Sequence, residues 1–88
     1  MTGESWSVRF ARRADKDMER LDPPVQQRVV SAIQRLVDED PRADVRKLAG
    51  SDEQRLRVGN WRVRFERNAL AREIVVLRIL PRGRAYDR

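Results

Sequence analysis

Arginines surround the only tyrosine of the chain close to its end. The chain finishes RILPRGRAYDR (78–88), so an apolar segment runs into Arg82, Arg84 and Tyr86. The planar guanidinium of arginine can bind phosphate through two parallel hydrogen bonds. A tyrosine phenol can orient a ribose hydroxyl, exchange a proton or stack on a base. This segment is either a solvated tail or part of a site that handles phosphate, and the rest of the chain has to distinguish the two.

More arginines alternate with apolar residues on both sides of Gly59-Asn60. Segments 54–58 and 61–66 flank this pair, which predicts a tight β-hairpin with a fixed register. Like charges directly opposite each other destabilise a sheet by roughly a few tenths of a kcal/mol. The hairpin face is either solvated, with its arginine stems covering apolar surface, or a phosphate-binding face. The register pairs four residues, here called the arginine ladder: Arg57 opposite Arg62, and Arg55 opposite Arg64.

Histidine is absent from the chain. The protein therefore lacks the commonest general base near neutral pH and the commonest metal ligand, which excludes His-based triads and the usual zinc hydrolase sites. RNA carries its own nucleophile, the 2′-OH. A protein that holds the RNA backbone in line and neutralises its charge can therefore accelerate cleavage without metal or histidine.

Positive charge is concentrated in the second half of the chain. Residues 1–44 contain 8 basic and 9 acidic residues, a net charge of −1, whereas residues 45–88 contain 12 and 5, a net of +7. Of the 20 basic residues, 18 are arginine. Codon bias can enrich a protein in arginine, but it does not explain the asymmetry between halves. A polyanion, and nucleic acid first, is the expected partner.

The elements that must position these arginines follow from hydrophobic periodicity. Alternating or continuous apolar residues predict four strands, and helical spacing predicts two helices joined by a short turn and packed antiparallel. Residues 41–53 are predicted to be a polar connection with one small apolar cluster. The order is β-α-α-β-β-β, which is an α+β domain whose helical hairpin covers one face of a small sheet. The predicted strands are 5–10, 54–58, 61–66 and 73–80, and the predicted helices are 12–21 and the segment between the N-cap Asp22 and Pro41.

Length and composition limit the setting of the protein. A chain of 88 residues is expected to form one domain, residues 1–88. It contains no cysteine, and no apolar run approaches the roughly 18–20 residues of a membrane span. The N-terminus, MTGESWSVRF, lacks the apolar stretch of a signal peptide. We therefore expect a cytoplasmic protein without a membrane partner.

Taken together, the motifs resemble the RelE/ParE superfamily of bacterial toxin–antitoxin toxins, and the RelE branch more closely. The likeness covers nearly the whole chain, including its length and the order of its elements. It implies a RelE-like α+β fold, with a mostly antiparallel four-stranded sheet and the helical hairpin on one face. The motifs that carry it are KLAG (47–50), RLRVGNWRVRF (55–65), VVLRI (75–79) and RGRAY (82–86).

The resemblance also implies a function and partners. It implies a ribosome-dependent endoribonuclease that cleaves mRNA in the ribosomal A site, with no cofactor and no metal. It implies a cognate antitoxin that wraps the toxin, and contact with operator DNA only through that antitoxin.

The resemblance assigns candidate site residues at the positions of this chain that match the family's motifs. A free arginine is a poor general acid because its pKa exceeds 12, so Tyr86 is the more plausible group for proton exchange. The family often has lysines at the first hairpin strand, where this chain has arginines, and Pro81 and the short interval before Tyr86 are further departures. The candidate catalytic residues are Arg62, Arg82 and Tyr86, and the candidate RNA-binding residues are Arg55, Arg57, Arg64, Arg84 and Lys47.

Two other functions stay open from the sequence. ParE-like relatives share the fold but bind and inhibit DNA gyrase without cleaving RNA. They generally lack the set Arg62, Arg82 and Tyr86, so the presence of that set favours the RelE branch. A basic RNA-binding module without activity is the third possibility, in which arginine substitutions weaken binding and abolish no reaction.

Overall fold

The computed structural model describes residues 6–83 of the chain. It contains two helices and five strands in the predicted order, with one additional strand within residues 41–53. The predicted α+β class is therefore confirmed, and the predicted count of four strands was one too few. The elements are β1 (Ser7–Phe10), α1 (Arg12–Glu19), α2 (Pro23–Val37), β2 (Val45–Lys47), β3 (Gln54–Val58), β4 (Trp61–Asn68) and β5 (Glu73–Pro81).

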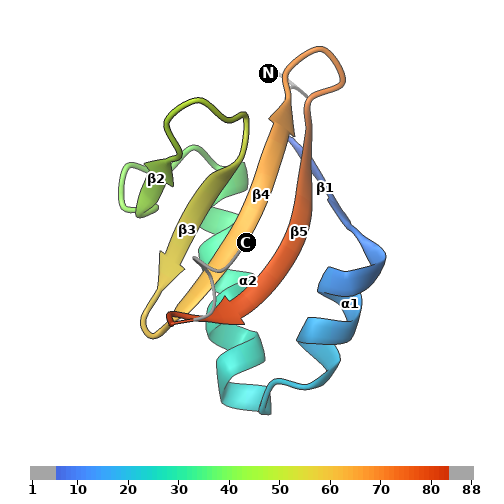
Figure 1. Cartoon of the computed structure of the whole chain (residues 1–88), viewed down its shortest axis with the longest axis vertical. Coiled ribbons are helices and arrows are strands. Elements are labelled where there is room, and N and C mark those ends of the chain that lie inside the picture. The colour runs from blue at the N-terminus through green and yellow to red at the C-terminus, as the bar shows by residue number, and fades with distance from the viewer. Residues whose placement is uncertain (1–5, 84–88) are drawn as a thin grey trace.

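The strands form a single sheet in the order β1-β5-β4-β3-β2 (Figure 1). β1 pairs with β5 in parallel, and every other neighbouring pair is antiparallel. β5 lies between β1 and β4, which agrees with its nearly continuous apolar sequence. The long strands β4 and β5 form the centre of the molecule, and the two edge strands are short.

The additional strand β2 consists of three residues at the edge of the sheet. Val45 pairs with Leu56, and Lys47 pairs with Gln54. A segment of three residues is too short for alternation to predict a strand, and its neighbours in 41–53 are polar. β2 matters for the site because it brings Arg46 opposite Arg55 of β3.

Both helices cover the same face of the sheet (Figure 1). Asp22 is at the N-cap of α2 as predicted, but its side chain makes no capping hydrogen bond. No helix within residues 6–83 is long and apolar enough to cross a membrane. The core lies between the helices and the sheet and consists of Ala14, Leu21, Val29, Ala32, Ile33, Leu36, Leu56, Val63, Phe65, Ile74, Val76 and Ile79.

A two-residue turn joins β3 to β4. Gly59 has a φ of 60°, whereas Asn60 has no positive φ, which is the pattern of a type II′ turn with glycine at its first central position. Val58 pairs with Trp61, and Leu56 pairs with Val63. The predicted register is confirmed, and it places the arginine ladder on the face of the sheet that the helices leave open.

A β-bulge interrupts the pairing of β4 with β5. Arg64 pairs with Arg78 and Phe65 pairs with Val76, so Leu77 has no partner on β4. Because one residue is skipped, Val76 and Ile79 both reach the core although they are three residues apart. The same bulge keeps Arg78 in line with Arg64 on the open face.

Candidate nucleic-acid interface

Four arginines lie opposite one another across four neighbouring strands. The pairs are Arg46 with Arg55, Arg55 with Arg64, and Arg64 with Arg78. Neighbouring strands are only about 4.8 Å apart, so these like charges repel unless other groups compensate them. This line, here called the arginine row, extends the predicted ladder by one strand on each side. Arg46 and Arg78 were not among the predicted site residues.

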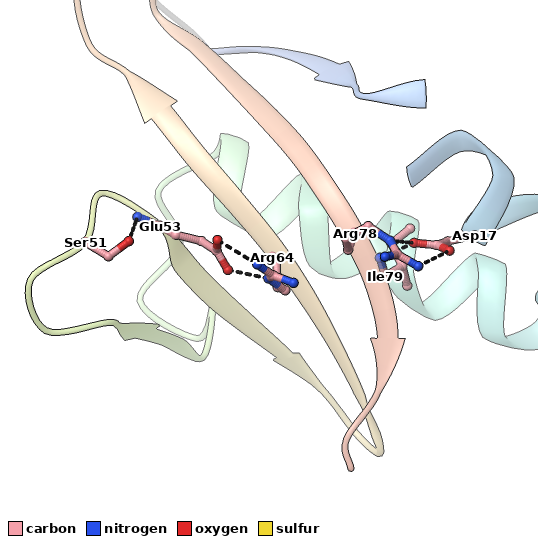
Figure 2. A network of polar contacts seen from close by, with 6 residues as sticks. All are labelled: Asp17, Ser51, Glu53, Arg64, Arg78 and Ile79. Atoms are coloured by element: carbon pink, nitrogen blue, oxygen red, sulfur yellow. Dashed lines mark hydrogen bonds and ion pairs between the residues drawn. The ribbon is translucent and has the colours of Figure 1, made fainter. Parts of the chain in front are cut away.

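Glu53 compensates Arg64. The residue lies at the end of the loop before β3, and its carboxylate accepts hydrogen bonds from Arg64 Nε and, at 2.9 Å, from Arg64 Nη2 (Figure 2). The hydrogen bonds from Arg64 lower the pKa of Glu53 below its ordinary 4.5, and Arg55 adds to this effect. The same contact raises the pKa of Arg64. Arg64 is therefore already bound to a carboxylate within its own chain.

Asp17 of α1 compensates Arg78 in a similar way. Its carboxylate accepts hydrogen bonds from Arg78 Nε at 2.8 Å and Nη2 at 3.1 Å, and a third from the backbone N–H of Ile79 at 2.9 Å (Figure 2). Burial alone would raise the pKa of Asp17, but the hydrogen bonds from Arg78 and Ile79 bring it below its ordinary 3.8. This pair fixes α1 against the edge of β5 beyond the end of β1.

Arg62 is buried, with only 4% of its surface exposed. Its Nη1 donates hydrogen bonds to the carbonyl oxygens of Gly59 and Trp61, each at 2.9 Å. Its Nε is also buried and has no hydrogen-bond partner among residues 6–83. In this geometry the candidate catalytic residue Arg62 holds the hairpin turn together and points its Nη1 at main-chain oxygens.

Arg57 and Arg46 remain accessible at the β3–β2 edge. Both contact Asp44, at 3.6 Å from Arg57 Nε and 3.5 Å from Arg46 Nε. These are long, exposed contacts, with 47% of the Arg57 side chain and 67% of the Arg46 side chain accessible to solvent. Exposed ion pairs of this kind contribute about 0–1 kcal/mol, so both arginines can exchange Asp44 for another anion.

Arg82 lies at the same end of the sheet as the hairpin turn. Its backbone N–H donates a hydrogen bond of 2.8 Å to the carbonyl oxygen of Asn60, and its side chain is exposed. Trp61 pairs with Pro81, which fixes the chain just before Arg82. The structure thus brings the candidate residues Arg57 and Arg82 to one end of the open face.

The remaining candidates have different positions. Lys47 is exposed at the end of β2 and borders a shallow depression of about 680 Å³, which Arg9 and Glu66 also line. Arg55 is half-buried in the arginine row. Arg84 and Tyr86 lie outside the described residues. Within residues 6–83, no three His, Cys, Asp or Glu side chains are grouped so that they could hold a metal ion.

The arginines of the open face therefore differ in their surroundings. Arg64 and Arg78 are bound by carboxylates, Arg62 is bound by carbonyl oxygens, and Arg55 is half-buried in the arginine row. Arg46, Arg57 and Arg82 are exposed to solvent. Asp17 and Glu53 were not predicted as site residues from the sequence. A charged residue within an otherwise apolar strand, as at position 78, is a sequence signal that could have indicated a buried ion pair.

Comparison with known proteins identifies relatives of this chain. The family model described as "ParE toxin of type II toxin-antitoxin system, parDE" matches residues 8–86. A chain of the RelB–RelE antitoxin–toxin complex from Methanococcus jannaschii is 27% identical, with a TM-score of 0.74 over 91% of this chain and 96% of that chain. No curated protein sequence matches significantly.

Two further solved structures are similar. A chain of the toxin–antitoxin complex RelBE2 from Mycobacterium tuberculosis is 26% identical and has a TM-score of 0.77, covering 89% of this chain and 99% of that chain. A chain of the archaeal RelE–RelB complex from Pyrococcus horikoshii is 26% identical, with a TM-score of 0.75 over 91% and 98% of the two chains.

Proposed function

The chain belongs to the ParE toxin family of type II toxin–antitoxin systems, and from this premise we propose that it is an endoribonuclease toxin. Its substrate in this proposal is mRNA in the A site of the translating ribosome, and its place of action is the cytoplasm. The RelE chains that it resembles come from complexes with RelB antitoxins, which supports the RelE branch of the superfamily.

The observation that carries this proposal is the exposed cationic end of the open sheet face. Arg57 and Arg82 lie there on rigid elements, one on β3 and one tied to the hairpin turn by its backbone N–H. Two guanidinium groups near one end of a sheet can contact neighbouring phosphates of a single RNA strand. They would neutralise the charge that develops when the 2′-OH attacks the phosphorus atom.

The other candidate residues have different roles in this proposal. Arg46 and Arg55 extend the cationic surface across β2 and β3 and would hold the RNA backbone. Arg62 can contact RNA only after it leaves the carbonyl oxygens of Gly59 and Trp61. Tyr86 is proposed as the group that orients or exchanges the proton.

A cognate antitoxin is the second part of the proposal. An antitoxin segment with acidic side chains would neutralise the exposed arginines and exclude RNA from them. Co-expression with the product of the neighbouring gene should restore cell growth and yield a stable complex. A chain that is harmless alone and forms no such complex would contradict this part.

The decisive experiment maps 5′ ends of a defined mRNA on programmed ribosomes. Wild type is compared with Arg82→Ala and Tyr86→Phe, and Arg13→Ala on the exposed face of α1 serves as the matched control. Cuts confined to the A-site codon should fall about 10²–10³-fold in rate for Arg82→Ala and stay unchanged for Arg13→Ala. Partial loss with Tyr86→Phe would implicate its hydroxyl group.

Inhibition of DNA gyrase is the second candidate function. Two observations favour it. The matching family model is described as a ParE toxin, and Arg62, one of three residues that separated the two branches, is buried against the hairpin turn. If the message stays intact while growth stops, a supercoiling assay with purified gyrase is the next test. Inhibition there would assign the exposed arginines to a protein-binding surface.

A further inference from the structure

The two carboxylates that bind arginines of the row, Asp17 and Glu53, differ in how firmly they are held. Asp17 is fixed by three hydrogen bonds, one of them from the main chain of β5, and it lies on a helix that is packed against that strand. Among residues 6–83, the Glu53 carboxylate accepts hydrogen bonds from a single side chain, that of Arg64. The Arg78 pair is therefore part of the framework, whereas the Arg64 pair can open by rotation of one glutamate side chain.

The segment that carries Glu53 is held by weak local contacts. Residues 48–53 close on themselves through Ser51 N–H to the carbonyl of Leu48 at 3.2 Å and Leu48 N–H to the carbonyl of Glu53 at 3.4 Å. The Ser51 hydroxyl accepts the N–H of Glu53 at 3.0 Å (Figure 2). Residues 49–52 are exposed. Segments with few buried contacts open at low free-energy cost, so this loop does not prevent Glu53 from moving.

Arg64 lies inside the row that an RNA backbone would follow. It is directly opposite Arg55, with Arg46 beyond, and both its Nε and Nη2 face an anion. A guanidinium fork binds a carboxylate and a phosphate with the same two-point geometry. Replacing one by the other leaves no buried charge without a partner.

We propose that Glu53 is an internal substitute for an RNA phosphate, which occupies Arg64 in the free protein and gives way to the RNA backbone on binding. This inference rests on the proposed function and adds to it a fifth phosphate contact and a competitor for that contact. Glu53 lowers the affinity for free RNA, because RNA must displace it. Only a strand held against the whole row, with contacts to Arg46, Arg55, Arg57 and Arg82, gains enough to do so.

A phosphate polymer is favoured over an acidic protein segment as the displacing group. Single-stranded RNA carries one negative charge per nucleotide, so its successive phosphates can meet successive arginines of the row. Each cation that it neutralises releases counterions, which gives the exchange a measurable salt signature.

The test measures binding of a single-stranded RNA of about ten nucleotides with 2′-O-methyl riboses, which cannot be cleaved. Fluorescence anisotropy at several salt concentrations compares wild type with Glu53→Gln. Glu66→Gln is the matched control, because Glu66 is exposed in neighbouring β4, and its removal changes the net charge equally. Urea unfolding of each variant reports whether the fold is retained.

We expect Glu53→Gln to bind about three- to tenfold more tightly than wild type, because RNA no longer has to displace a carboxylate. The log–log salt slope should change by less than about 0.7, the contribution of one phosphate contact, because both proteins make the same phosphate contacts once RNA is bound. Glu66→Gln should change affinity less than twofold. Adding Arg64→Gln to Glu53→Gln should remove the gain, so that the two substitutions are strongly non-additive.

Three outcomes would overturn the inference. The first is that neither Glu53→Gln nor Glu53→Ala binds more tightly than wild type. The second is that Glu66→Gln produces an equal gain, and the third is that the gain survives Arg64→Gln. Glu53→Ala is measured in parallel in case glutamine still holds Arg64 by its amide oxygen, and no gain with either variant ends the proposal. If the wild-type protein binds RNA and Glu53→Gln gives the expected gain, but no cleavage occurs in the ribosome assay, the result counts against the proposed function alone.

Discussion

At the scale of single residues, Arg62 illustrates how one side chain can serve the fold and a candidate site at once. Its guanidinium donates to two carbonyl oxygens beside the hairpin turn and is nearly inaccessible to solvent. Removing it would leave both oxygens without these hydrogen bonds, each of which contributes about 0.5–1.5 kcal/mol to stability. A loss of activity in an Arg62 variant therefore has two possible causes, which stability measurements can separate.

Arg62→Ala is expected to lower the free energy of unfolding by about 1–3 kcal/mol. Arg57→Ala, the exposed residue directly opposite, should change it by less than about 0.5 kcal/mol. Urea unfolding followed by tryptophan fluorescence measures both. An Arg62→Ala protein that is as stable as wild type but inactive would assign Arg62 to RNA and contradict the structural role.

At the scale of elements, α1 acts as a cover for the edge of β5. β1 pairs with β5 only as far as Val76, and beyond that point Asp17 accepts the N–H of Ile79. The Asp17 side chain is only 9% exposed, and the Arg78 side chain is 23% exposed. One carboxylate thus accepts a hydrogen bond from a backbone N–H at the edge of β5 and neutralises Arg78 of the arginine row.

Asp17→Ala is expected to destabilise the protein by about 3 kcal/mol, because it leaves Arg78 half-buried without its counter-ion. Asp15→Ala on the exposed face of the same helix is the control and should cost well under about 1 kcal/mol, the range of a helix-dipole contribution. Urea midpoints of the two variants are compared. Equal midpoints would show that the Asp17 contacts contribute little.

The same ion pairs predict how stability depends on pH. The pKa values of Asp17 and Glu53 lie below their ordinary 3.8 and 4.5 in the folded protein. A carboxylate of this kind stabilises the fold fully above its unfolded pKa, and that contribution is lost as the pH falls through the folded pKa. Unfolding free energy should therefore be flat above about pH 5.5 and fall below about pH 4.5.

Asp17→Ala should make this acid decline shallower. The measurement is a series of urea titrations between neutral and acidic pH. A decline of wild-type steepness in the variant would mean that other carboxylates control it. Asp40, a half-buried carboxylate whose pKa the hydrogen bond from Arg42 lowers to about 2, is the first alternative.

Local sequence signals predicted the elements but not their long-range ion pairs. The register of β3 with β4 follows from a two-residue turn and an alternating pattern, both readable from neighbouring residues. Asp17 and Arg78 are 61 positions apart, and their contact depends on how α1 packs against β5. The three-residue β2 and the bulge at Leu77 arise from pairing with other strands, which no local pattern reveals.

At the scale of the whole molecule, the charge asymmetry of the sequence becomes an asymmetry of layers. Residues 1–44, with a net charge of −1, supply both helices and one edge strand, and residues 45–88, with +7, supply the other four strands. The helices cover one face only (Figure 1). The excess positive charge therefore lies in the half of the chain that forms most of the sheet. The molecule therefore has one cationic face, which is the face that we propose binds RNA.

Binding of single-stranded RNA should accordingly weaken with salt, with a log–log slope of about −3 to −4 for five phosphate contacts. Arg13→Ala on the exposed face of α1 should leave that slope unchanged, whereas Arg57→Ala should reduce its magnitude by about 0.7. Anisotropy titrations at several salt concentrations give both values. A slope near zero would remove RNA as the partner of this face.

The hairpin turn at Gly59-Asn60 also limits how the gene can change over evolutionary time. Side chains alternate along β3 and β4, so changing the length of β3 by one residue would move Arg55 and Arg57 into the core and Leu56 out of it. Length changes are tolerable in the exposed loops at 48–53 and 69–72, which lie outside the paired strands. Descendants of this chain should therefore differ in loop length, while the distance from Arg55 to Arg64 stays constant.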